Sequence, residues 1–218
     1  HPTGYPLYTV IGHVVIAMLG SLINCSPGRA MTLMSAVLLA ITFAVLARYF
    51  LRLMREAPLA SERPIGCECG MAYLTPAIGL AMLIAFSRTV WEHATFAEVY
   101  PLTFLIQSLV VLTCWIPAGK RPTLARTATL GLLMGLGALN HYSILACGPL
   151  MLLCLWHWSR LMNRRRAAWA LGLGCAAIML TGYLYLPLRA MANPPLKWGD
   201  PSSPQRLRWT LTGRQYRT

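Results

Sequence analysis

The chain has 218 residues, of which 56% are hydrophobic and 11% are charged, and its mean hydropathy is +0.54. A soluble domain carries about 25% charged residues, so this composition excludes a soluble enzyme. It also excludes a disordered chain, which would be poor in apolar residues and rich in charge. We therefore expect an all-α, polytopic membrane protein.

The net charge of +13 arises from 19 basic and only 6 acidic residues. On a soluble chain this balance would favour a nucleic-acid partner. Here the basic residues are clustered between apolar runs, where they indicate which span ends face the cytoplasm. We therefore expect membrane lipid to be a partner, and no nucleic acid.

The first apolar run covers 6–23 and is interrupted by Gly12, His13 and Gly20. A full membrane span needs about 20 mainly apolar residues, so this run is either a marginal span or a juxtamembrane or re-entrant helix. Its short length and its interruptions favour the juxtamembrane or re-entrant helix. Because the chain starts at His1, inside what reads as a motif, we expect further sequence before it.

Six further runs are long and apolar enough to predict membrane spans, with bounds of about 30–51, 71–90, 99–117, 125–140, 142–159 and 167–188. Eleven basic residues lie in three of the connections, at 48–63, 120–126 and 160–166. Lys and Arg near span ends favour the cytoplasm, so we assign these connections to the cytoplasmic side. Residues 1–189 then form the transmembrane domain, and 190–218 begin a non-cytoplasmic segment.

The ends that this topology places outside hold carboxylates, imidazoles, arginines and aromatic rings. We predict that ten of these residues bind substrate: His1, Tyr5, Arg29, Glu92, Tyr100, Asn140, His141, Arg189, Trp198 and Asp200. Ionisable groups gathered on one membrane face indicate a site. For Tyr100 and Trp198, an aromatic belt at the membrane interface is an equally good explanation.

Glu98 is the residue most indicative of catalysis. It lies between Ala97 and Val99 at the start of a predicted span, where an acidic group is costly unless it faces a cavity or a partner. The alternative is that its charge only stabilises the N-terminus of that helix. We favour the catalytic interpretation.

Three further polar residues have two interpretations each. Asn140 and His141 stand in a turn between two predicted spans. They either satisfy the backbone of that turn or donate to a phosphate or a sugar hydroxyl. Arg189, at the outer end of the last span, either reaches lipid headgroups or binds phosphate in a bidentate manner.

Two small-residue patterns favour structural interpretations. Gly131, Gly135 and Gly137 follow no predicted strand, so they predict close packing of membrane helices rather than a nucleotide-binding loop. Cys67 and Cys69 form the only close cysteine pair in the sequence, and no second pair or neighbouring His completes a zinc site. We expect no bound metal.

Four sequence blocks together resemble one family. HPTGYPLY (1–8) is similar to its HPPGYPL signature, with Thr3 in place of the second Pro, and FSRTVWEHATFAEVYPL (86–102) resembles its FS-x-x-x-W…AEVY block. GLGALNHYSIL (135–145) resembles its NH turn, and YLYLPLR followed by NPPLKWGDPSS (183–203) resembles its YLP…WGD block. In this order they are typical of the protein O-mannosyltransferase-like transmembrane family, related to the GT-C glycosyltransferases. The second block resembles the eukaryotic transmembrane protein 260 type more than bacterial members.

The resemblance implies a GT-C-like helical bundle that moves a sugar from a dolichyl or polyprenyl phosphate carrier to a Ser or Thr hydroxyl of an acceptor protein. It implies the endoplasmic reticulum membrane, or the inner membrane of a bacterium, and no bound cofactor. It places the juxtamembrane helix at 6–23, the usual catalytic base before His1, and a second acidic position at Glu98. A fragment without that base is expected to be inactive.

Under the same resemblance, the carrier phosphate would be held by Arg29, Arg189 and His141. The alternatives to an enzyme are a multi-pass transporter and a non-catalytic membrane scaffold. A transporter is disfavoured because the chain shows no internal repeat and its polar residues lie at one face rather than in mid-span.

Overall fold

The computed structural model describes residues 5–56, 69–117, 119–192 and 200–212, and every regular element within these ranges is a helix. This confirms the all-α prediction. The α-helices are α1 (Pro6–Ile23), α2 (Pro27–Glu56), α3 (Cys69–Ala85), α4 (Arg88–Thr95), α5 (Tyr100–Cys114), α6 (Leu124–Asn140), α7 (Gly148–Leu161), α8 (Arg165–Leu180), α9 (Tyr185–Met191) and α10 (Pro204–Thr212). Two short 3-10 helices, η2 (Tyr142–Cys147) and η3 (Thr181–Leu184), precede α7 and α9.

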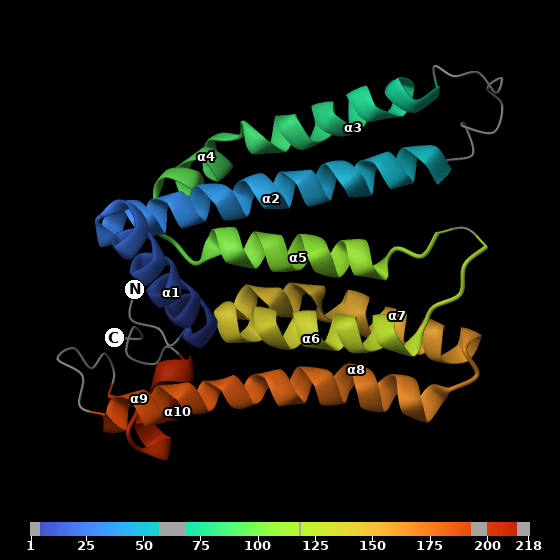
Figure 1. Ribbon diagram of the computed structural model, residues 1–218. Helices are drawn as coiled ribbons and strands as arrows, with labels where there is room; N and C mark the ends of the chain where they lie inside the picture. Colours follow the sequence, from blue (N-terminus) through green and yellow to red (C-terminus); the bar gives the residue numbers. More distant parts are fainter. Residues whose placement is uncertain (1–4, 57–68, 118, 193–199, 213–218) are drawn as a thin grey trace.

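The long helices run side by side along one axis. Figure 1 shows α2, α3, α5, α6, α7 and α8 in this arrangement, with α1, α4, α9 and α10 gathered at one end of the bundle. This is the end that the charge pattern assigns to the non-cytoplasmic side. The buried core lies between α5, α6 and α7 and is formed by Leu102, Ile106, Val110, Leu130, Met134, Ile144, Met151, Leu155 and Trp158.

The number of membrane spans is not confirmed at six. Four helical stretches, Pro6–Ile23, Pro27–Glu56, Tyr142–Leu161 and Arg165–Met191, are long and apolar enough to cross a membrane. A fifth is counted if α3 and α4 form one bent span. α5 has 15 residues and α6 has 17, so both are shorter than the length of about 20 residues that a straight span needs.

The predicted span 71–90 is not one continuous helix, because it breaks near its outer end. The helix α3 stops at Ala85, and α4 then continues at 68° to it. Ser87 has an extended backbone, with φ −65° and ψ 144°, which interrupts the helical hydrogen-bond ladder. The residues of α4 are more polar, and Arg88 pairs with Glu92 at 2.9 Å on its exposed face. The chain therefore turns aside where the apolar run ends.

α1 has the bounds of the apolar run 6–23, and Figure 1 shows it lying across the end of the bundle at a steep angle to α2. Val10, Val14 and Met18 follow one another at intervals of four residues and are all exposed, so they form an apolar stripe that faces away from the bundle. This arrangement favours the juxtamembrane interpretation. The position of α1 relative to a membrane stays a prediction.

The glycines of α6 let it approach α8 closely. A Cβ added at Gly131 would lie 2.1 Å from the carbonyl oxygen of Gly172, and one added at Gly135 would lie 2.7 Å from that of Ala176. Both contacts are with α8 backbone, which cannot move aside as a side chain can. The packing role predicted for these α6 glycines is confirmed.

We expect Gly131→Ala and Gly174→Ala to change stability in opposite directions. In a helix, Gly→Ala alone stabilises by about 0.5–1 kcal/mol. Nothing lies within 4 Å of a Cβ at Gly174, so that variant should gain stability. Gly131→Ala should instead lose about 1–3 kcal/mol through overpacking. Thermal unfolding of the purified protein in detergent measures both, and equal shifts would contradict the close helix contact.

Candidate functional site

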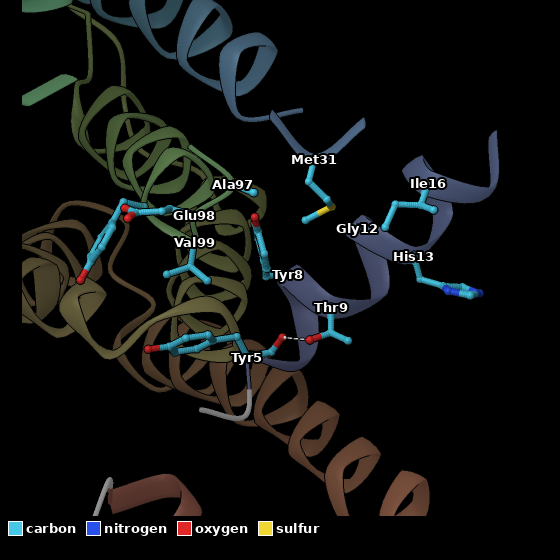
Figure 2. Close-up of a pocket in the computed structure, with 11 residues that line it drawn as sticks. Tyr5, Tyr8, Thr9, Gly12, His13, Ile16, Met31, Ala97, Glu98 and Val99 are labelled. Atoms are coloured by element: carbon cyan, nitrogen blue, oxygen red, sulfur yellow. Dashed lines mark hydrogen bonds between the residues drawn. The ribbon is translucent and has the colours of Figure 1, made fainter. Parts of the chain in front are cut away.

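A cavity of about 550 Å³ lies at the α1 end of the bundle, between α1, the first turns of α2 and the segment that leads into α5. Figure 2 shows these residues around it. Its lining consists of Tyr5, Tyr8, Thr9, Gly12, His13, Ile16, Met31, Ala97, Glu98, Val99 and Tyr100. Three of the predicted site residues, Tyr5, Glu98 and Tyr100, therefore come together here.

Glu98 is held by a histidine rather than by a helix end. Its Oε2 lies 2.7 Å from Nδ1 of His93, and the two side chains are 40% and 22% exposed, respectively. The residue that precedes α5 is Val99, and no side chain caps this helix by hydrogen bonding. Glu98 thus lines the cavity, and one oxygen of its carboxylate is held by His93.

Aromatic rings surround the histidine that binds Glu98. The ring of His93 lies 4.9 Å from Tyr100 and 5.9 Å from Phe104, between ring centroids. Tyr100 in turn lies 5.2 Å from His141, whose ring is also 5.4 Å from Tyr5. A continuous set of ring contacts therefore joins the start of α1, the start of α5 and the end of α6.

His141 is a buried group in this arrangement. It is only 5% exposed, and burial lowers its pKa below the ordinary value of 6.5. Its Nδ1 accepts a hydrogen bond from the backbone N–H of Ser143 at 3.2 Å, so in the neutral ring the proton lies on Nε2. This hydrogen bond agrees with the interpretation in which His141 satisfies the backbone of the turn. Burial disfavours the imidazolium, and the expectation that His141 holds a carrier phosphate stays a prediction.

Asn140 is fully buried and ties α6 to α5. Its Nδ2 donates to the hydroxyl of Thr103 at 2.7 Å and to the carbonyl of Val99 at 3.1 Å. Asn140 does not line the cavity. It was predicted to bind substrate, and the structure gives it instead the role of positioning the segment next to Glu98.

The other predicted site residues lie away from the cavity lining. Arg29, in the first turn of α2, and Arg189, in α9, are both exposed. Glu92 is paired with Arg88 on α4, and Asp200 is paired with Arg206 near α10. His1 and Trp198 lie outside the described residues, as does Cys67.

Two residues of the site were not predicted from the sequence. His93 lies five positions before Glu98, across the break between α4 and α5, and no helical periodicity relates the two. Tyr8 follows Tyr5 by three positions, which is a same-face spacing in a helix, and this spacing was the available signal. The Tyr8 hydroxyl is buried and has no hydrogen-bond partner among the described residues.

Residues 1–163 match the family model of the protein O-mannosyl-transferase TMEM260 N-terminal domain. This confirms the resemblance that the sequence blocks indicate. Glu98, His93 and Asn140 lie within the matched range, whereas Arg189 and Asp200 lie beyond it. No curated protein and no solved structure matches the chain.

The lowered pKa of His141 predicts a pH dependence of stability. The unfolded chain binds this proton at higher pH than the folded chain, so the free energy of unfolding falls as the pH drops from about 6.5 toward the folded pKa. We expect His141→Asn, which keeps an acceptor for Ser143, to reduce this loss. Thermal unfolding between pH 7.5 and 5 measures it. His13→Asn, an exposed control, should keep the wild-type dependence, and an equal slope in all three proteins would contradict the assignment.

Proposed function

Because the chain belongs to the protein O-mannosyl-transferase TMEM260 family, we propose that it forms part of a membrane glycosyltransferase. The proposed reaction moves mannose from a dolichyl or polyprenyl phosphate to a Ser or Thr hydroxyl of an acceptor protein. The observation that supports it is the cavity-lining carboxylate of Glu98, held by His93 at the end of the bundle assigned to the non-cytoplasmic side. We propose the endoplasmic reticulum membrane as its location, or the inner membrane in a bacterium.

The transfer is a substitution at the anomeric carbon of the sugar. The acceptor oxygen forms the new bond to that carbon, the bond from the carbon to the phosphate oxygen breaks, and the carrier phosphate leaves with the electron pair. The hydroxyl proton passes to a carboxylate acting as general base. We assign Glu98 to the acceptor hydroxyl, where it orients the oxygen and assists the base. No metal or other cofactor is part of this proposal.

His93 is the positioning residue for this carboxylate. Its Nδ1 holds one oxygen of Glu98 at 2.7 Å, and the rings of Tyr100 and Phe104 restrict the imidazole. The remaining carboxylate oxygen is then free to accept from the acceptor hydroxyl. Preorganisation of this kind reduces the cost of aligning the reacting groups.

We expect Glu98→Gln to lower mannosyl transfer by about 10²-fold or more, the contribution of a positioned acid or base. Glu92→Gln is the matched control, because its carboxylate lies on the exposed face of α4 and is paired with Arg88. The measurement is transfer from dolichyl-phosphate mannose by the full-length protein in microsomes. Undiminished activity in Glu98→Gln would overturn this role. If the protein is a transporter or a scaffold, neither the wild type nor the Glu92→Gln variant will transfer mannose.

The positioning role of His93 predicts a rescue by a conservative variant. His93→Gln retains an amide that can donate to Glu98, whereas His93→Leu removes every donor. We expect the Leu variant to lose as much activity as Glu98→Gln and the Gln variant to lose about tenfold less. Comparable losses in both, accompanied by lower thermal stability, would indicate that His93 only packs the structure.

A further inference from the structure

A second cavity, of about 440 Å³, lies where α5 and α7 end. Figure 1 shows that these helix ends are at the opposite end of the bundle from α1. The charge pattern assigns this end to the cytoplasmic side. The second cavity is therefore separate from the candidate active site and is independent of the proposed transfer.

The lining of this cavity combines apolar and basic side chains. Ile116 follows the end of α5, and Leu153 and Leu161 lie on α7, and all three contribute apolar surface. The charged or ionisable contributors besides cysteine are Lys120 and His157, and no Asp or Glu is among the described lining residues. An occupant that matches both parts is an amphiphile with a negative head.

Local structure fixes the positions of both basic groups. Gly119 has a positive φ of 74°, and the backbone N–H of Lys120 donates to the carbonyl of Pro117 at 3.0 Å, which returns the chain toward the end of α5. His157 lies on the same face of α7 as Leu161, one turn before it. The two side chains approach the cavity from different elements.

The attraction of cations to helix C-termini does not explain why Lys120 and His157 lie at this cavity. A cation near a helix C-terminus is expected on electrostatic grounds, and Arg126 fills that role by donating to the carbonyl of Trp115 at 2.8 Å, just after α5. Arg160 lies over the ring of Trp156, 4.3 Å from its centre. Lys120 and His157 make no side-chain hydrogen bond or ion pair with the described part of the chain.

We propose that this cavity binds the headgroup of an anionic phospholipid of the cytoplasmic leaflet. Lys120 and His157 face the lipid phosphate, and the acyl chains continue along Ile116, Leu153 and Leu161. Basic pockets between membrane helices on this side of a bilayer are suited to anionic headgroups. The apolar surface favours a lipid over free phosphate, because only a lipid covers both parts of the cavity.

The test uses the purified full-length protein in a neutral detergent, with thermal unfolding followed by tryptophan fluorescence. Dioleoylphosphatidylserine should raise the unfolding temperature, whereas dioleoylphosphatidylcholine and inorganic phosphate should not. Lys120→Gln should weaken the apparent affinity for phosphatidylserine about fivefold, as expected for one Lys near an anionic surface. Arg121→Gln is the matched control, because it removes the same charge from the adjacent residue, which does not line the cavity.

The proposal is overturned if phosphatidylcholine stabilises the protein as strongly as phosphatidylserine, since binding would then not depend on the headgroup charge. It is also overturned if Lys120→Gln and Arg121→Gln weaken binding equally, because the effect would be that of general surface charge. Stabilisation by inorganic phosphate alone would replace the lipid with a soluble anion. Unfolding temperatures of both variants without lipid should equal that of the wild type, which shows that each is folded.

Discussion

The buried amide of Asn140 fixes the geometry of the candidate site. Its Nδ2 donates to the hydroxyl of Thr103 and to the carbonyl of Val99 at the start of α5, so one buried side chain joins the end of α6 to the segment that leads into α5. Val99 is the neighbour of Glu98, so this clamp also places the carboxylate. Asn140 is the last residue of α6. The close contact of Gly131 with the backbone of α8 packs α6 against that helix. The position of Glu98 thus depends on helix packing well inside the bundle.

The course of the helices could be predicted where hydrophobic runs have polar borders. The run 125–140 became α6 with nearly the same bounds, because Thr123 caps its start and the turn at His141 ends it. In the run 71–90 the sequence does not show the break, where the extended backbone of Ser87 separates two helices that a hydropathy window joins. The count of about six spans stays unconfirmed for a related reason. The apolar content of a run does not indicate at which residues its helix begins and ends.

The site could be predicted only in part. The charge pattern indicates which residues lie at the non-cytoplasmic end of the bundle, but it does not indicate which of them line a cavity. Glu98 lies at the cavity and has a partner, as expected for an acidic group between apolar neighbours, and its catalytic role stays a prediction. Glu92 and Asp200 lie at the same end of the bundle, yet each forms an ion pair with an arginine close to it in sequence. The partner of Glu98, His93, lies across a helix break, and only the tertiary structure brings the two together.

The electrostatics of the cavity constrain how a lipid-linked sugar could lie in it under the proposed function. No Lys or Arg is among the described lining residues around Glu98, and burial lowers the pKa of the nearby His141. A carrier phosphate next to Glu98 would meet like-charge repulsion in a partly dry environment. Under the proposed function the phosphate is therefore better placed away from Glu98, and the acceptor hydroxyl next to it.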